Sequence, residues 1–213
     1  MWHALRTELA YFRPWLLGGF GIAAGIVVLL GILLRLFGGA EDVPSFLPGM
    51  FAILAGMVVS FIAHSYRFEE RRARLFLAGP LTPRQIAGII VLLPAVLVSL
   101  GALAAIPMLG LASLVSGKID LADLGLLGVL AGQFLAYAQM APLVHEAVAA
   151  HGQGRSRAAI LGWLGIILTI PVLIAFYWFE KQPLIYLPGH LIVVVALMAV
   201  TMVLYQGRTD FTR

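Results

Sequence analysis

The sequence predicts an all-α membrane protein, with its 213 residues forming a single transmembrane domain. Hydrophobic residues make up 62% of the chain, whereas soluble domains contain about 45–50% apolar residues. Charged residues make up 11%, which is too few to cover a soluble surface, because soluble domains carry about 25%. Apolar runs approaching the roughly 20 residues of a membrane span recur along the chain. A soluble enzyme or transcription factor is therefore excluded.

Residues 1–13 are expected to form an amphipathic helix that lies along the inner leaflet. One helical face carries apolar side chains at spacings of three and four residues: Trp2, Leu5, Leu9 and Phe12. Pro14 is predicted to end this helix, because proline donates no backbone hydrogen bond and its ring clashes with the preceding turn. The aromatic side chains would then lie at headgroup depth. The alternative is a frayed chain terminus.

Six apolar runs are predicted to cross the membrane as helices. They cover residues 15–37, 46–66, 85–115, 124–150, 158–179 and 190–205. The third run contains Pro94 and Pro107 and is longer than a straight span requires. We therefore expect tilt, a kink or a break near Pro107. Residues 180–189 are expected to form a short outer turn.

Basic residues are distributed unequally between the two sides of the predicted membrane domain. With a cytoplasmic N-terminus, most of the 14 basic residues lie inside: Arg6, Arg13, Arg67, Arg71, Arg72, Arg74, Arg84, Arg155, Arg157, Arg208 and Arg213. The outer side carries Arg35, Lys118 and Lys181. Because cytoplasmic loops are enriched in Lys and Arg, both termini are predicted to be cytoplasmic, in a multi-pass protein of the inner (plasma) membrane. The net charge of +4 thus indicates loops that face anionic lipid.

The most informative stretch joins the second and third runs on the predicted inner side. Residues 67–83 begin with a helical pattern of mixed charge, which is followed by the apolar patch Leu75-Phe76-Leu77. Gly79-Pro80 is expected to end this short helix. A charged helix with an apolar patch, held at the inner membrane face, indicates a docking element. The alternative is a solvated basic loop that only enforces topology.

The end of this stretch predicts a capped helix start. Thr82 has the character of an N-cap, Pro83 of a first helical residue, and Gln85 of the third residue of a capping box. Leu81 and Ile86 are spaced as a hydrophobic staple across it. The third span is therefore predicted to begin abruptly, directly after a sharp turn.

The stretch resembles the loop between the second and third helices of ABC-2 type ABC transporter permeases. In that family an acidic and basic run precedes a leucine-rich patch and a turn into the third span, and the order here is the same. The resemblance implies a cytoplasmic coupling helix between helices 2 and 3 that docks on an ATPase. It assigns coupling to Glu69, Glu70, Arg71, Arg72, Leu75, Phe76, Pro80, Thr82 and Gln85.

The resemblance also implies a function and partners. The chain would be the permease subunit of an ATP-driven exporter, paired with a second permease copy or a related permease, on cytoplasmic ABC ATPase subunits. The chain has no GxxxxGK[ST] phosphate loop, so ATP and Mg²⁺ are expected on the partner ATPase, with no cofactor in this chain. One alternative is a haem-exporter-like permease of cytochrome c biogenesis, favoured by the run from Leu168 to Pro171. Another is a non-transport scaffold that recruits a cytoplasmic partner.

Partial motifs do not support an enzyme. Glu69-Glu70-x-x-x-Arg74 matches one motif of intramembrane CAAX-type proteases, but the histidine motifs of that family are missing. His145-Glu146 begins like HExxH, but Ala149 stands where the second zinc ligand is required. The chain has no cysteine, so it offers no thiolate ligand or nucleophile. We expect no catalytic residue, no metal site and no nucleic-acid partner.

Polar residues within the predicted spans are candidates for a substrate path: Gln133, Tyr137, Gln139, Glu146 and Thr169. An ionisable residue inside a span, such as Glu146, is a functional candidate by default. The alternative for Glu146 is snorkelling to the interface or pairing with Arg155 or Arg157. For the uncharged residues the alternative is hydrogen bonding across helices. Because few charges occur in the spans, an amphipathic or lipid-like cargo is expected.

Overall fold

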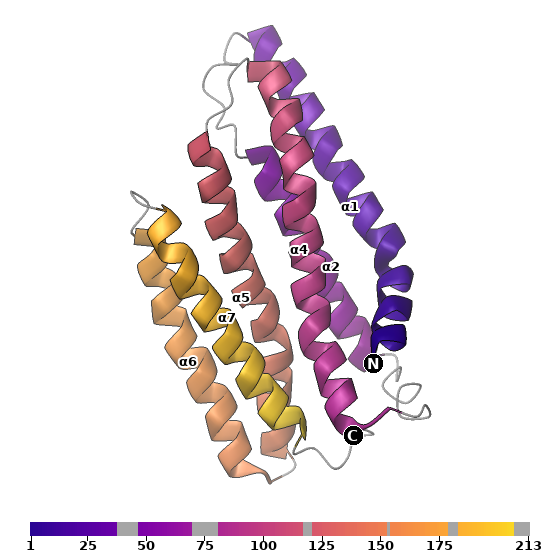
Figure 1. Ribbon diagram of the computed structural model, residues 1–213, viewed down its shortest axis with the longest axis vertical. Helices are drawn as coiled ribbons and strands as arrows, with labels where there is room; N and C mark the ends of the chain where they lie inside the picture. The colour runs from indigo at the N-terminus through magenta and orange to yellow at the C-terminus, as the bar shows by residue number, and fades with distance from the viewer. Residues whose placement is uncertain (38–46, 70–80, 117–120, 153, 179–182, 207–213) are drawn as a thin grey trace.

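The computed structural model describes residues 1–37, 47–69, 81–116, 121–152, 154–178 and 183–206, almost all of them helical (Figure 1). This part of the chain forms six helices: α1 (Trp2–Phe37), α2 (Leu47–Glu69), α4 (Pro83–Ser116), α5 (Leu121–Gly152), α6 (Ser156–Trp178) and α7 (Pro183–Gln206). The all-α prediction is therefore confirmed. The helices α1, α4, α5 and α7 are long and apolar enough to cross a membrane. In α2 and α6 the described apolar stretches are shorter, at Gly49–Ala63 and Ser156–Ile167.

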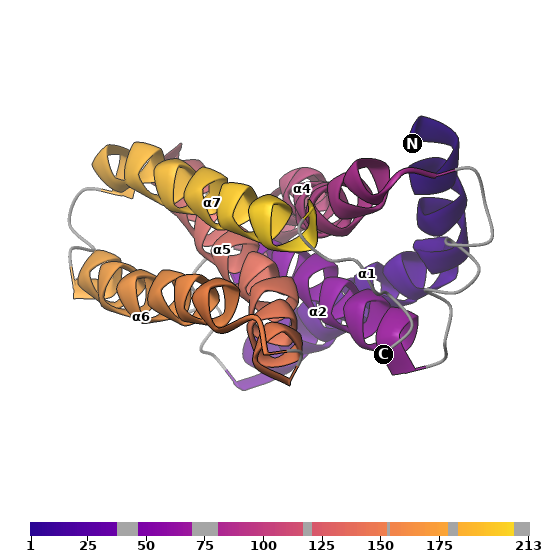
Figure 2. The same cartoon turned by 90° about the horizontal axis from the view of Figure 1, so that it is seen from below.

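Successive helices run in opposite directions, side by side along the long axis of the molecule (Figure 1). One end of the bundle holds the beginnings of α1, α4 and α6 together with the last turns of α2, α5 and α7. We call it the N-terminal end of the bundle. The helices form two groups, because α1, α2 and α4 contact one another, as do α5, α6 and α7. We call these groups the first half and the second half (Figure 2). Contacts of α5 with α2 and α4, and of α4 with α7, join them.

In the first half, glycines allow α2 and α4 to pack closely on each other. A side-chain carbon added to Gly56 would lie 2.6 Å from the backbone oxygen of Leu97, and one added to Gly101 would lie 2.7 Å from the backbone oxygen of Ala52. Small residues allow membrane helices to approach this closely. The α2–α4 contact is the most extensive in the bundle, so these two helices form one packed unit.

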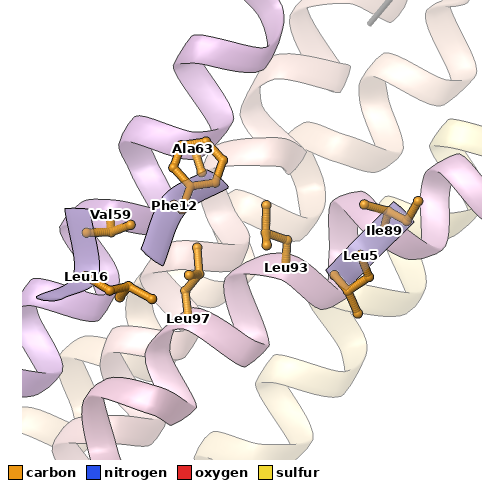
Figure 3. Packing of buried hydrophobic residues seen from close by; sticks show 8 residues of the cluster. All are labelled: Leu5, Phe12, Leu16, Val59, Ala63, Ile89, Leu93 and Leu97. Atoms are coloured by element: carbon orange, nitrogen blue, oxygen red, sulfur yellow. The ribbon is translucent and has the colours of Figure 1, made fainter. Parts of the chain in front are cut away.

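The helix α1 covers the α2–α4 pair with its buried face. Leu5, Phe12 and Leu16 of α1 enter a cluster with residues of α2 and α4, which are Val59, Ala63, Ile89, Leu93 and Leu97 (Figure 3). The opposite face of α1 is open, and Ile22, for example, is 66% exposed. Apolar side chains are also exposed on α6 and α7. An outer surface of this kind is suited to lipid and not to water.

The prediction that Pro14 ends a separate first helix is wrong. Pro14 lies inside α1, which runs unbroken from Trp2 to Phe37. In Figure 2 the first turns of α1 stand at an angle to the rest of the helix, as a proline inside a helix produces. Phe12 and Leu16 enter the same buried cluster from either side of Pro14, so tertiary packing holds the two segments together. The predicted apolar face therefore packs largely on protein, whereas its first residue, Trp2, is exposed.

Two further boundaries differ from the sequence prediction. Of the three alternatives predicted for the long third run, which were tilt, a kink or a break near Pro107, the break is absent, because α4 continues through both Pro94 and Pro107. The predicted outer turn over residues 180–189 is wrong in its second part, since α7 begins at Pro183 and not at His190. Proline is favourable at the first helical position, where its missing N–H would have had no partner. The remaining predicted spans agree with the helices to within a few residues.

Candidate functional site

The predicted capping box is present at the start of α4. The backbone N–H of Gln85 donates to Thr82 Oγ1 at 3.3 Å, and the backbone N–H of Thr82 donates to Gln85 Oε1 at 2.9 Å. The backbone N–H of Ile86 donates to the Thr82 carbonyl at 3.0 Å, which is the first bond of the helix. These bonds satisfy donors that a helix start otherwise leaves without partners. The chain therefore enters α4 in one defined direction.

The start of α4 is anchored on α7. Ile86, Ala87 and Ile90 form a buried cluster with Tyr205, and Leu81 packs against it. The predicted staple thus includes both of its residues and extends to a third partner, the completely buried Tyr205 near the end of α7. Because Leu81 precedes the cap and Tyr205 belongs to the second half, this cluster links the chain entering α4 to the other half of the molecule.

The connection between α5 and α6 is a tight turn at the N-terminal end of the bundle. The backbone N–H of Arg155 donates to the Ala150 carbonyl at 2.8 Å, and that of Gly154 donates to the His151 carbonyl at 3.1 Å. Gly154 adopts φ 71°, a left-handed conformation that is favourable for glycine because it has no Cβ to clash with the backbone. This pattern is a Schellman motif, which ends α5 and satisfies its last carbonyls.

Arg155 connects this turn to α7. Its Nη2 donates to the backbone carbonyl of Leu204 at 3.1 Å. Leu204 belongs to the last turn of α7, whose carbonyls have no partner within the helix. A cation at a helix C-terminus also interacts favourably with the helix dipole. Sequence reasoning assigned Arg155 only to topology or to pairing with Glu146, because its actual acceptor is a backbone atom on a distant helix.

Gln139 is a structural link between α5 and α4. The residue is fully buried, and its Nε2 donates to the backbone carbonyl of Val91 at 2.8 Å. Val91 lies in the turn of α4 just before Pro94, but the carbonyl that Pro94 leaves without its helix donor is that of Ile90, four residues earlier. A backbone carbonyl has two lone pairs, so Val91 O can accept from Gln139 in addition to its bond within the helix. The structure therefore assigns Gln139 to a cross-helix bond and not to the surface of an open path.

Glu146 lies two turns from Gln139 along α5, near the N-terminal end of the bundle. It is 0% exposed, and so are Leu143, Ala147 and Ala150 around it in the sequence. Close packing surrounds this part of α5, since a side-chain carbon on Gly162 of α6 would lie 2.7 Å from Ala147 Cβ. Snorkelling of Glu146 to the interface is therefore wrong for this structure. A buried carboxyl inside a span keeps its standing as a functional candidate.

Gln133 and Tyr137 lie on a different face of α5. Gln133 Nε2 donates to Tyr137 Oη at 3.3 Å, one turn along the same helix. The bond is therefore local and does not cross to another helix. Tyr137 is 36% exposed, in contrast to the fully buried Gln139. The predicted path residues are thus not brought together: Gln139 and Glu146 are enclosed, while Tyr137 is exposed and Gln133 is half-buried.

Several predicted site residues fall outside the described part of the structure. Glu70, Arg71, Arg72, Leu75, Phe76 and Pro80 lie within residues 70–80, which are not described. Glu69 is the last residue of α2 and Thr169 belongs to α6, and the side chains of both lie outside the description. Of the predicted coupling residues, Thr82 and Gln85 are therefore those whose geometry is defined.

Two buried polar residues on α7 escaped the sequence prediction. Thr201 Oγ1 donates to the Leu197 carbonyl at 2.8 Å, and His190 is completely buried. Thr201 satisfies its hydroxyl within its own helix, as Ser and Thr commonly do in membrane helices. Within the described residues, no group of three or more His, Asp or Glu side chains is arranged to hold a metal ion.

An apolar groove lies between α1 and α2, with a volume of about 350 Å³. Its lining is apolar and includes small residues, as follows: Pro14, Trp15, Gly18, Gly19, Ile22, Ala55, Val58, Val59 and Ile62. None of the candidate path residues lines this groove. Comparison with known proteins finds no matching family model, curated protein or solved structure. The functional assignment therefore rests on the residues and geometry described above.

Proposed function

We propose that this chain is the permease subunit of an ABC-2 type exporter in the inner membrane. All six helices would cross the membrane, since even the 23 residues of α2 or α6 extend about 34 Å, which exceeds a ~30 Å hydrocarbon core. A separate cytoplasmic ATPase would supply the energy. The cargo would be amphipathic or lipid-like, because few charges occur in the helices.

The distribution of basic residues supports the proposed orientation. Arg6, Arg13, Arg84, Arg155 and Arg157 all belong to the N-terminal end of the bundle. Antiparallel neighbours bring these residues from three separate regions of the sequence to one side of the membrane. Under the positive-inside rule that side is cytoplasmic. A cysteine at the exposed Ser156 should then resist an impermeant thiol reagent in intact cells, whereas one at Lys118 should react.

The observation that carries the proposal is the connection between residues 70–80 and the α2–α4 unit. This segment leaves α2 and returns to α4 through the capping box at Thr82 and Gln85. Because α2 and α4 touch through Gly56 and Gly101, a displacement of the segment would move both helices together. The arrangement supports a mechanism in which ATPase closure pushes this segment and shifts the first half against the second.

Contacts between the two halves would then change when the first half shifts against the second. Leu81 and Ile86 pack with Tyr205, and Gln139 bonds to Val91. Glu146 lies on the Gln139 face of α5, closer to the capped start of α4. A shift of α4 against α5 and α7 would alter the Gln139 and Tyr205 contacts and the surroundings of the buried Glu146, so these residues are assigned to conformational coupling. Direct contact with cargo is not required of them.

The decisive experiment measures how strongly the ATPase is retained by variants of residues 67–85. Burial of Phe76 in a partner's cleft would contribute about 1.5–3 kcal/mol, whereas an exposed ion pair of Arg72 would contribute about 0–1 kcal/mol. Phe76→Ala should therefore reduce ATPase co-purification more than Arg72→Ala. Thr82→Ala should fall between them, because it misdirects the segment without removing its contact surface.

Membrane insertion of each variant is the control, measured as detergent-extracted chain per cell. Full ATPase retention by Phe76→Ala would contradict the coupling assignment. Purification of the unmodified chain without any ATPase would contradict the exporter function and favour the scaffold alternative.

A further inference from the structure

The middle of α5 carries a polar pair on an outward-facing stripe. Tyr137 lies halfway along Leu121–Gly152, and Gln133 lies one turn before it. Val144 and Val148 continue the same stripe, because their spacings of seven and four residues return to one helical face. Tyr137 is 36%, Val144 37% and Val148 55% exposed, and Gln133 is half-buried, so the described helices leave most of this stripe accessible.

The bond between Gln133 and Tyr137 uses only part of their hydrogen-bonding capacity. The carboxamide donates one hydrogen to the phenolic oxygen. The phenolic hydrogen and the carboxamide Oε1 remain available, since a tyrosine hydroxyl both donates and accepts and a glutamine carries a separate carbonyl acceptor. At mid-membrane depth neither water nor a lipid tail satisfies these groups. The stripe therefore favours a protein partner that offers one acceptor and one donor.

A second copy of the same stripe offers that complementary pair. Two copies inserted in the same orientation are related by a two-fold axis along the membrane normal, which sets their α5 helices parallel. Long side chains on a helix point toward its N-terminus. The phenol of Tyr137 would then reach the level of Gln133 on the second copy and donate to its Oε1. The symmetric bond would form at the same time.

We propose that the α5 stripe formed by Gln133, Tyr137, Val144 and Val148 is the contact surface between two copies of this chain. The proposal rests on the proposed function for the presence of two permease copies in one assembly. It adds which face they use and which polar groups hold the register. Val144 and Val148 have small side chains, so the two α5 helices can approach closely between the polar pair and the C-terminal end of α5.

The natural absence of cysteine makes a direct test simple. Val144→Cys should form a disulfide-linked dimer when native membranes are oxidised with copper phenanthroline. Ile192→Cys is the matched control, because Ile192 is 70% exposed on α7 but lies outside the stripe, and it should remain monomeric. In the Val144→Cys background, Tyr137→Phe and Gln133→Leu should each reduce cross-linking. In lipid vesicles of increasing dilution, each should raise the dimer Kd by roughly tenfold, since two symmetric bonds are lost.

The outcomes separate this proposal from the exporter assignment. Cross-linking at Val144 in a chain that retains no ATPase would support the stripe while overturning the exporter function. ATPase retention without cross-linking at Val144 and at Val148→Cys would overturn the stripe alone. Cross-linking at Ile192 in place of Val144 would overturn it as well. Loss of transport in Gln133→Leu without cross-linking at Val144 would identify the pair as a cargo contact and overturn the proposal.

Discussion

The two halves of the molecule hold their helices together by different means. In the first half, α2 and α4 meet backbone to backbone at Gly56 and Gly101. Among the described residues, this half buries one polar side chain, Ser60, whereas the second half buries four, which are Gln139, Glu146, His190 and Thr201. Lipid is as apolar as leucine, so burial alone does not drive membrane helices together. The first half relies on close steric fit. The second half adds buried polar groups, of which Gln139 bonds to α4 of the first half, while Arg155 bonds the start of α6 to the end of α7.

This difference predicts how each half fails. A closely fitted contact is sensitive to added volume and indifferent to the loss of a polar group. A contact that contains buried polar groups is sensitive to the removal of one partner, because the other is left unsatisfied. It also suits movement, since a hydrogen bond can exchange partners whereas interlocked backbones move as one body. In the proposed mechanism, the ATPase acts on residues 70–80, which connect directly to the rigid α2–α4 unit.

The largest effect is expected at the glycine contact. Gly56→Ala should destabilise the protein by about 1–3 kcal/mol, because the new methyl group meets the fixed backbone oxygen of Leu97. The control is Gly25→Ala on α1, where nothing lies within 4 Å of the added carbon. That variant should gain about 0.5–1 kcal/mol from reduced backbone entropy. Equilibrium unfolding in mixed detergent micelles measures the change in unfolding free energy of both variants. Changes of the same sign would contradict the assignment of the Gly56 contact to close steric fit.

The next largest effect is expected at Gln139. Gln139→Leu should cost about 1–2 kcal/mol, because it removes the buried bond that joins α5 to the Val91 carbonyl of α4. Pro94→Ala is the matched background, because the N–H that it restores would bond to the carbonyl of Ile90, four residues earlier, and not to that of Val91. The cost of losing Gln139 should therefore be the same in the natural and the Pro94→Ala backgrounds, as measured by a double-mutant cycle of unfolding free energies. A smaller cost in the Pro94→Ala background would show that Gln139 compensates for the proline.

A smaller effect is expected where Arg155 meets the end of α7. Arg155→Gln should cost about 1 kcal/mol, because a partly buried bond to the Leu204 carbonyl is weakened or lost. Arg157→Gln is the control, since Arg157 is exposed and surface charges contribute little. Hydrogen exchange in the last turn of α7 should accelerate in the first variant alone. Equal acceleration in both would mean that charge, and not the specific bond, stabilises this end.

The smallest of these effects on stability is expected at the capping box, where the groups are exposed. Thr82→Ala should cost about 0.5–1 kcal/mol, near the lower end of the range for a lost N-cap. Thr82→Ser keeps the hydroxyl and should leave stability nearly unchanged. Exchange rates of the Gln85 and Ile86 amides, compared between the two variants, measure the local effect. Identical rates would show that Gln85 and the preceding turn define the helix start without Thr82.

Features that depend on neighbouring residues were predictable from the sequence. The capping box at Thr82 and Gln85 needs only four consecutive positions, and it is confirmed. Apolar runs define α2, α4, α5 and α6 to within a few residues, because span length is a local property of composition. The resemblance to ABC-2 permeases concerns residues that mostly lie outside the described structure, so it remains a prediction.

Features that depend on distant partners were not predictable. Pro14 breaks an isolated helix, but Phe12 and Leu16 hold α1 together through contacts with α2 and α4. The acceptors of Gln139 and Arg155 are backbone carbonyls 48 and 49 residues away. No spacing rule connects such positions. The burial of Glu146 likewise follows from how α5 packs in the bundle, and its side-chain chemistry alone favours the interface.

The turn at Gly154 also constrains how the protein is made. The Schellman bonds hold the end of α5 close to the start of α6. The connection is short, because the backbone of Arg155, the residue just before α6, bonds to Ala150 in the last turns of α5. Under the proposed six-span topology, the two helices would partition from the translocation channel into lipid as one hairpin. An epitope or reporter inserted after Gly154 would separate them during synthesis, so fusion mapping at this position would report a misassembled chain. Single-residue labelling preserves the hairpin and is the sound way to map this region.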